Sequence, residues 1–69
     1  MKLSARNVIE GTITRIVKGP VSTEVTLRVA PRIDIVSVIS SGSARALKLR
    51  KGGRASAVIK ASSVMLGVD

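Results

Sequence analysis

Residues 21–30 read VSTEVTLRVA, and this stretch decides the fold class. Apolar or β-branched side chains occupy every second position over ten residues, with polar or small side chains between them. A period of two is typical of a β-strand with one face turned to the core. We therefore predict a strand from Val21 to Ala30.

The other regular segments predict further strands and one short helix. We expect strands over residues 7–17, 33–39, 54–59 and 64–68, and one or two helical turns over residues 44–47, with N-cap hydroxyls at residues 40–43. The prediction is an all-β fold, a five-stranded OB-like barrel with one short helix between strands 3 and 4, forming a single domain over residues 1–69. A loose five-stranded sandwich is the competing architecture.

The Lys18-Gly19-Pro20 break sets the expected register of the first two strands. A hairpin that pairs Val17 with Val21 places Glu10 opposite Arg28, which predicts a cross-strand ion pair. Gly11 in the first strand indicates a bulge or a close backbone approach.

The composition points to an oligomer with an anionic partner. The chain has 69 residues, 45% of them hydrophobic, yet it has no Phe, Tyr, Trp or Cys, so aromatic bulk and disulfides cannot stabilise a small core. We therefore expect a homo-oligomer. Twelve Lys and Arg against four Asp and Glu give a net charge of +8, which favours an anionic ligand or partner.

The same composition argues against several functional classes. The sequence argues against nucleic acid as the partner, because single-strand binders stack bases on aromatic residues and the basic residues here are scattered. Without His or Cys, and with only scattered carboxylates, neither an acid–base relay nor a metal-ligand cluster can be assembled. We expect no enzyme activity and no cofactor. No membrane span or signal peptide is recognisable, so we expect a cytoplasmic protein.

Two polar clusters are candidates for the anion site. Lys60 stands in the otherwise apolar run IKASSVML, residues 59–66, where a desolvated ammonium needs an opposite charge and Ser62 adds a hydroxyl. Near the start, Arg6 offers a fork of donors, and Ser4 lies two positions away on the same side of an extended segment. From chemistry alone, the alternative is that Lys60 extends from a strand end into solvent and Arg6 is a solvated charge.

These motifs resemble a known family. The similarity runs over the whole chain and is carried by SARN at residues 4–7, Gly11, KGPV at residues 18–21, EV at residues 24–25, and above all IKASSVML at residues 59–66. The pattern is similar to the molbindins, small Mop-family molybdate-binding proteins with an OB-like TOBE domain. The resemblance implies a homohexamer, a trimer of dimers, that binds molybdate or tungstate between subunits.

The resemblance also implies which residues hold the anion. It assigns side chains of Ser4, Arg6, Lys60 and Ser62, backbone amides around Ala5 and Ala61, and the hydroxyl of Ser40 from the neighbouring chain. Many relatives carry Thr at the position of Ser40, and a Gly pair where this chain has Ala30-Pro31, so the turn into the third strand is expected to differ.

The function expected from the sequence is therefore non-enzymatic binding of molybdate or tungstate, for intracellular molybdenum storage, buffering or homeostasis. A small OB-type nucleic-acid-binding protein and a purely structural assembly module are the alternatives. Binding to oligonucleotides that weakens steeply with salt would favour the first of them.

Overall fold

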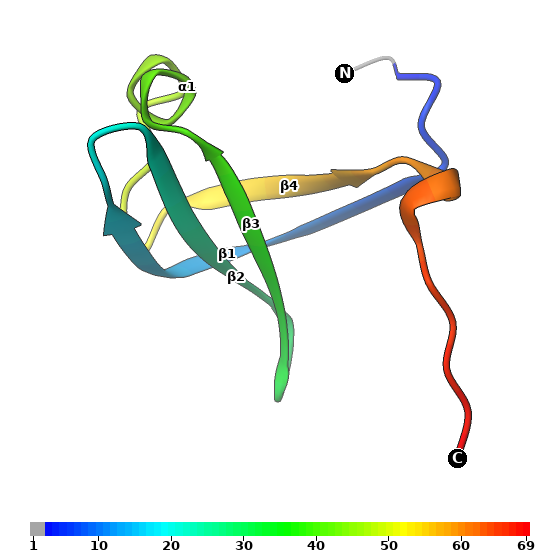
Figure 1. The fold of residues 1–69 in the computed structure, drawn as a ribbon. Coiled ribbons are helices and arrows are strands. Elements are labelled where there is room, and N and C mark those ends of the chain that lie inside the picture. Colours follow the sequence, from blue (N-terminus) through cyan, green and yellow to red (C-terminus); the bar gives the residue numbers. More distant parts are fainter. Residues whose placement is uncertain (1–2) are drawn as a thin grey trace.

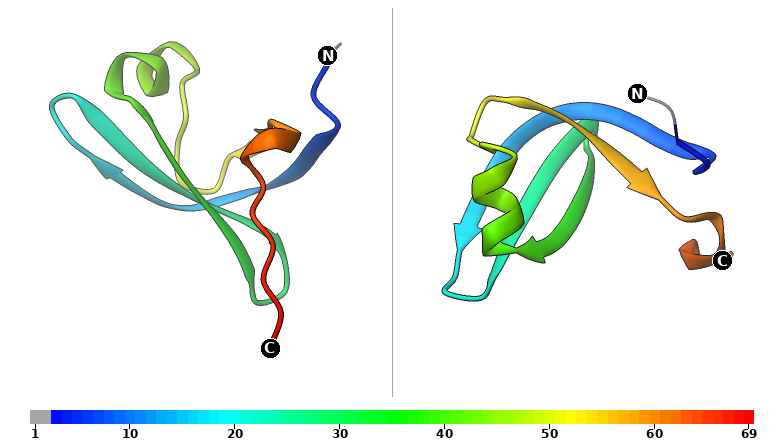
Figure 2. Two further views of the ribbon diagram at one scale, coloured as in Figure 1. Left: turned by 45° about the vertical axis from the view of Figure 1, so that its right-hand side comes forward. Right: turned by 90° about the horizontal axis from the view of Figure 1, so that it is seen from above.

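The computed structural model describes residues 3–69, which form one curled antiparallel sheet with a short helix at one end (Figure 1). The elements in chain order are β1 (Asn7–Lys18), β2 (Ser22–Ala30), β3 (Ile33–Ser40), α1 (Ser41–Ala46), β4 (Arg54–Ile59) and the 3₁₀ turn η1 (Ala61–Ser63). The sheet order is β3-β2-β1-β4, so β3 and β4 are its free edges. The curl produces a half-barrel that stays open between those two edges (Figure 2).

The strand β1 runs through both halves of the sheet. Its first half pairs with β4 from Asn7 to Thr12, and its second half pairs with β2 from Thr12 to Lys18. At the changeover, a Cβ on Gly11 would lie 2.5 Å from the carbonyl oxygen of Arg28. The close backbone approach predicted at Gly11 is therefore confirmed, and it lets the strand bend.

The core is small. Only Ile13, Val25 and Leu27 are buried apolar residues within residues 3–69, each at most 5% exposed. Val25 and Leu27 come from the alternating stretch that predicted β2, which confirms its buried face. Five partly buried side chains pack around them, namely Ile16, Val29, Leu49, Ala55 and Ala57.

A pair of buried hydroxyls fastens α1 to the β1–β2 hairpin. The Ser41 Oγ donates to the carbonyl oxygen of Gly19 at 2.6 Å and lies 2.8 Å from the Thr23 Oγ1. Both side chains are almost fully buried. The predicted short helix between the third and fourth strands is confirmed, and its expected N-cap hydroxyl comes from Ser40.

The predicted hairpin register is wrong. The β1–β2 turn is longer than assumed, so Val17 pairs with Glu24 rather than with Val21, and Arg28 lies opposite Thr12. Glu10 and Arg28 therefore do not meet. Each has another partner: Glu10 binds Arg54 at 2.6 Å, and Arg28 forms a bidentate pair with Asp34.

The fifth predicted strand is also absent from the described chain, so the five-stranded closed barrel is corrected to a four-stranded half-barrel. Residues 64–69 follow η1 as an extended tail that leaves the sheet (Figure 1). A strand needs a ladder partner for its backbone groups, and the tail has none within residues 3–69. The apolar character of residues 64–68 predicted a strand, but it does not provide the backbone partner that a strand needs.

A large part of the apolar surface remains uncovered. Among residues 3–69, fourteen large hydrophobic side chains are exposed, and those of Met65, Leu66 and Val68 are 93–100% exposed. The accessible surface is 5741 Å², against about 4,100 Å² expected for a monomeric protein of 7.2 kDa. Within residues 3–69, no helix has the length and apolar character that crossing a bilayer requires.

Candidate functional site

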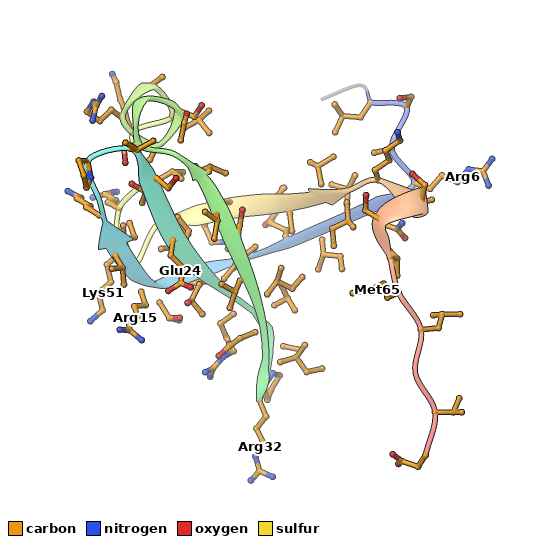
Figure 3. The ribbon with its side chains drawn as sticks, viewed as in Figure 1. Arg6, Arg15, Glu24, Arg32, Lys51 and Met65 are labelled. Carbon is orange, nitrogen blue, oxygen red and sulfur yellow. The ribbon has the colours of Figure 1, made fainter. Side chains whose placement is uncertain are left out.

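The pairing of β1 with β4 brings the two predicted motifs together. The last residue pair of this ladder is Asn7 with Ile59, and the Asn7 side-chain amide donates to the Ile59 carbonyl oxygen at 3.3 Å. Arg6 precedes Asn7 and Lys60 follows Ile59, so the antiparallel arrangement places the two cations at the same end of the sheet. Figure 3 shows the Arg6 side chain extending outward beside η1.

An open hollow lies between the two motifs. Its lining consists of Leu3, Ser4, Ala5, Arg6, Val58, Lys60, Ala61 and Ser62. Six of the seven predicted site residues are in this set. The hollow measures about 770 Å³ and is open to solvent. One chain therefore gathers the donors but does not enclose a small ion.

The two cations at this hollow have no partner in the described part of the chain. Arg6 and Lys60 form neither an ion pair nor a side-chain hydrogen bond among residues 3–69. Both are exposed. The expectation that Lys60 sits desolvated in an apolar strand is therefore wrong for the single chain, because β4 ends at Ile59 and Lys60 is the N-cap of η1.

The η1 turn contributes backbone donors next to Lys60. The Ser63 N–H donates to the Lys60 carbonyl oxygen at 2.8 Å, and the Val64 N–H to that of Ala61 at 3.3 Å. The N–H groups of Ala61 and Ser62 have no backbone acceptor among residues 3–69, as expected for the first residues of a helical turn. Two amides and the Ser62 hydroxyl therefore remain available to a ligand.

Ser40 is not part of the hollow. It ends β3, and β3 and β4 are opposite edges of the sheet. Its Oγ accepts the Ser43 N–H at 3.1 Å, which caps α1, and donates to the Ser43 Oγ at 2.7 Å. The structure thus brings six predicted site residues together in one chain and leaves the seventh at the far edge.

Two apolar residues of the lining were missed by sequence analysis. Leu3 and Val58 form part of the wall of the hollow. Val58 could have been found, because alternation along β4 places it on the same side as Lys60. No signal in the sequence distinguishes Leu3 from any other apolar residue near a terminus.

The remaining charges lie in ion pairs or away from the hollow. The hydrogen bonds from Arg28 lower the pKa of Asp34, and the Arg28 charge adds to that effect. Residues 3–69 hold no cluster of three His, Cys, Asp or Glu side chains that could ligate a metal ion. The lining of the hollow therefore combines two cations with hydroxyl and amide donors and contains no carboxylate.

Comparison with known proteins places the chain in a family. The TOBE domain family matches residues 3–66. The chain is a TOBE-domain protein of the Mop family. It is 38% identical to the molybdenum-pterin-binding protein 1 of Clostridium pasteurianum over 66 residues, covering 96% of this chain and 97% of that one. It is 46% identical to the molybdenum transport protein ModE of Herbaspirillum seropedicae, but it spans only 26% of that longer protein.

Solved structures agree with this assignment of the TOBE domain. A molybdate-binding protein from Sporomusa ovata superposes with a TM-score of 0.91 at 31% identity, over 99% of this chain and 100% of that chain. The cytoplasmic molybdate-binding protein ModG, in a form with molybdate bound, superposes with a TM-score of 0.94 at 45% identity. That match covers the whole of this chain and 49% of ModG.

Proposed function

We propose that this TOBE-domain protein binds molybdate or tungstate, without catalysing a reaction, at the hollow between residues 3–6 and residues 58–62. The observation that carries the proposal is the meeting of Arg6 and Lys60 at one end of the sheet, with no carboxylate in the lining. The molybdate-binding relatives of the same fold support it.

The donor set suits a small tetrahedral dianion. Arg6 and Lys60 supply two positive charges, and the hydroxyls of Ser4 and Ser62 together with the Ala5 and Ala61 amides supply neutral donors on several sides. A fully deprotonated oxyanion only accepts hydrogen bonds, so every contact can be satisfied without a proton transfer. Binding and release of the intact anion are the function that this chemistry serves.

A second chain is needed to complete the site. The hollow is too open for one ion, and Ser40 lies at the opposite sheet edge of the same chain. We infer that the neighbouring chain closes the hollow and supplies its Ser40 hydroxyl, whose proton would turn from the Ser43 Oγ to the ion. A homo-oligomer, with a hexamer built as a trimer of dimers as the assembly we favour, provides that geometry.

The uncovered apolar surface supports such an assembly. An apolar groove of about 350 Å³ runs between β3 and β4, and the apolar tail of residues 64–69 leaves its own sheet. We infer that this tail lies on another copy of the chain, where an edge strand offers its unpaired backbone groups. Association would then bury the side chains that a single chain leaves in water.

The biological role that follows is storage, buffering or homeostasis of molybdenum. We place the protein in the cytoplasm, as described for ModG. Residues 1–69 act as one domain in this proposal, which the family match over residues 3–66 supports. The site needs no cofactor, since its own donors hold the ligand.

Calorimetric titration with molybdate tests the assigned site. Lys60→Ala and Arg6→Ala each remove a charge-assisted donor, worth about 1.5–3 kcal/mol, so each should weaken binding roughly ten- to a hundredfold. Ser40→Ala and Ser62→Ala remove neutral donors and should cost about 0.5–1.5 kcal/mol.

The matched control is Lys51→Ala, which changes the net charge equally at the other end of the molecule (Figure 3). It should leave the affinity within about twofold, because a screened surface charge contributes little. If Lys51→Ala weakened binding as much as Lys60→Ala, the protein would attract anions by its bulk charge and the assigned site would be wrong.

A further inference from the structure

The hydroxyls of Ser40 and Ser43 form a pair at the start of α1. The Ser40 Oγ donates to the Ser43 Oγ at 2.7 Å and accepts the Ser43 N–H at 3.1 Å. We propose that Ser43 is a positioning residue for the anion site: its hydroxyl directs the Ser40 hydroxyl proton toward the ion bound on the neighbouring chain. This inference rests on the proposed function, in which Ser40 completes that site.

The backbone at Ser40 is held on two sides. Ser40 is the last residue of β3 and pairs with Ser22 of β2. The next residue, Ser41, donates its N–H to the Val21 carbonyl oxygen at 2.8 Å and its hydroxyl to the Gly19 carbonyl oxygen at 2.6 Å. Ser41 is buried, so these bonds are shielded from water. The position of the Ser40 backbone is therefore set by the β1–β2 hairpin, and only the side chain is free to respond to a ligand.

The side chain of Ser40 is held by its role as the N-cap of α1. The bond from the Ser43 N–H fixes the place of the Ser40 Oγ. A hydroxyl oxygen carries one proton and two lone pairs, and this bond occupies one lone pair. The direction of the proton is the freedom that remains, and the Ser43 hydroxyl is the group that competes for it.

The hydrogen bond between the two hydroxyls is reversible without movement of heavy atoms. In the single chain Ser40 is the donor, and the Ser43 proton has no acceptor among residues 3–69. Rotation of both hydroxyls makes Ser43 the donor over the same oxygen–oxygen distance. Both lone pairs of the Ser40 Oγ are then occupied, and its proton points away from α1. No proton is transferred in this exchange.

The reversed arrangement suits an oxyanion ligand. A deprotonated oxyanion only accepts hydrogen bonds, so it is bound by the arrangement in which Ser40 is a donor to it. Hydrogen bonds in a chain strengthen one another by roughly 10–30% each, so a Ser40 oxygen that accepts two bonds is the better donor. The helix cap alone does not account for this pair, because any residue at position 43 supplies the backbone N–H, whereas the exchange needs a hydroxyl there.

Calorimetric titration with molybdate of Ser43→Ala and Ser43→Thr tests the role of Ser43. Ser43→Ala should weaken binding about three- to tenfold, the effect of one neutral hydrogen bond, and by no more than Ser40→Ala does. Its melting temperature should stay the same or rise, because Ser43 is exposed and alanine favours a helix more than serine. Ser43→Thr keeps the hydroxyl and should stay within about twofold. Equal weakening by Ala and Thr would overturn the proposal.

A double-mutant cycle separates this inference from the proposed function. If Ser43 acts through Ser40, Ser43→Ala has no further effect on a protein that already carries Ser40→Ala. An equal loss in both backgrounds, or an unchanged affinity in Ser43→Ala while Ser40→Ala weakens binding, would overturn the role of Ser43 and leave the proposed site in place. An unchanged affinity in Ser40→Ala would show that the second chain does not supply Ser40, and would overturn both the site as proposed and this inference.

Discussion

Replacing Leu66 by Ala tests whether another chain covers the apolar tail. In the single chain the Leu66 side chain is 95% exposed, so its truncation should change the free energy of unfolding by no more than about 0.5 kcal/mol if the tail stays in water. If a partner buries it, the loss of three carbons at about 0.8 kcal/mol each gives about 2.4 kcal/mol. A residual cavity brings the expected range to about 2–5 kcal/mol per chain.

The assay is thermal unfolding together with light scattering at micromolar concentration. We expect Leu66→Ala to lower the melting temperature clearly and to weaken the oligomer, while Lys51→Ala, which also removes an exposed side chain, changes neither. A stable folded monomer in the unmodified protein, or an unchanged melting temperature in Leu66→Ala, would refute the covered tail.

Two further predictions concern the fold itself. Gly11→Ala should destabilise the protein by about 1–3 kcal/mol, because its Cβ would lie 2.5 Å from the Arg28 carbonyl oxygen. The control is Gly42→Ala, whose Cβ meets nothing closer than 3.9 Å. Equal melting temperatures of the two variants would contradict the close approach at Gly11. Arg28 lowers the pKa of Asp34 in the folded state, so this contribution to stability is present above about pH 3.9 and is lost as the pH falls through the lowered value. Between pH 7 and pH 3 the unmodified protein should therefore lose more stability than Asp34→Asn, and an identical loss in both would contradict this assignment.

Most of the secondary structure followed from local patterns, whereas the pairing did not. Alternation over residues 22–30 identified β2 because one face of that strand is buried, as Val25 and Leu27 show. The hairpin register was missed because it depends on turn length: the last pair is Lys18 with Thr23, so four residues, 19–22, connect the paired positions instead of the three assumed. Register also decides which charges meet, so the ion-pair prediction failed with it.

The site was predictable to the extent that it depends on strand pairing. An antiparallel β1–β4 ladder necessarily brings the residues before Asn7 next to those after Ile59, so Arg6 and Lys60 could be placed together. Whether the tail forms a strand could not be predicted, because its partner is not within the same chain. For the same reason, sequence reasoning overestimated the burial of Lys60.

Anomalous diffraction at the molybdenum edge, from crystals grown with molybdate, tests the central claim most directly. We expect a peak in the hollow within hydrogen-bonding distance of Arg6 and Lys60 of one chain, with Ser40 of a second chain completing the donor set. A peak that involved neither Arg6 nor Lys60, or a fully occupied site formed by one chain alone, would contradict the proposed site.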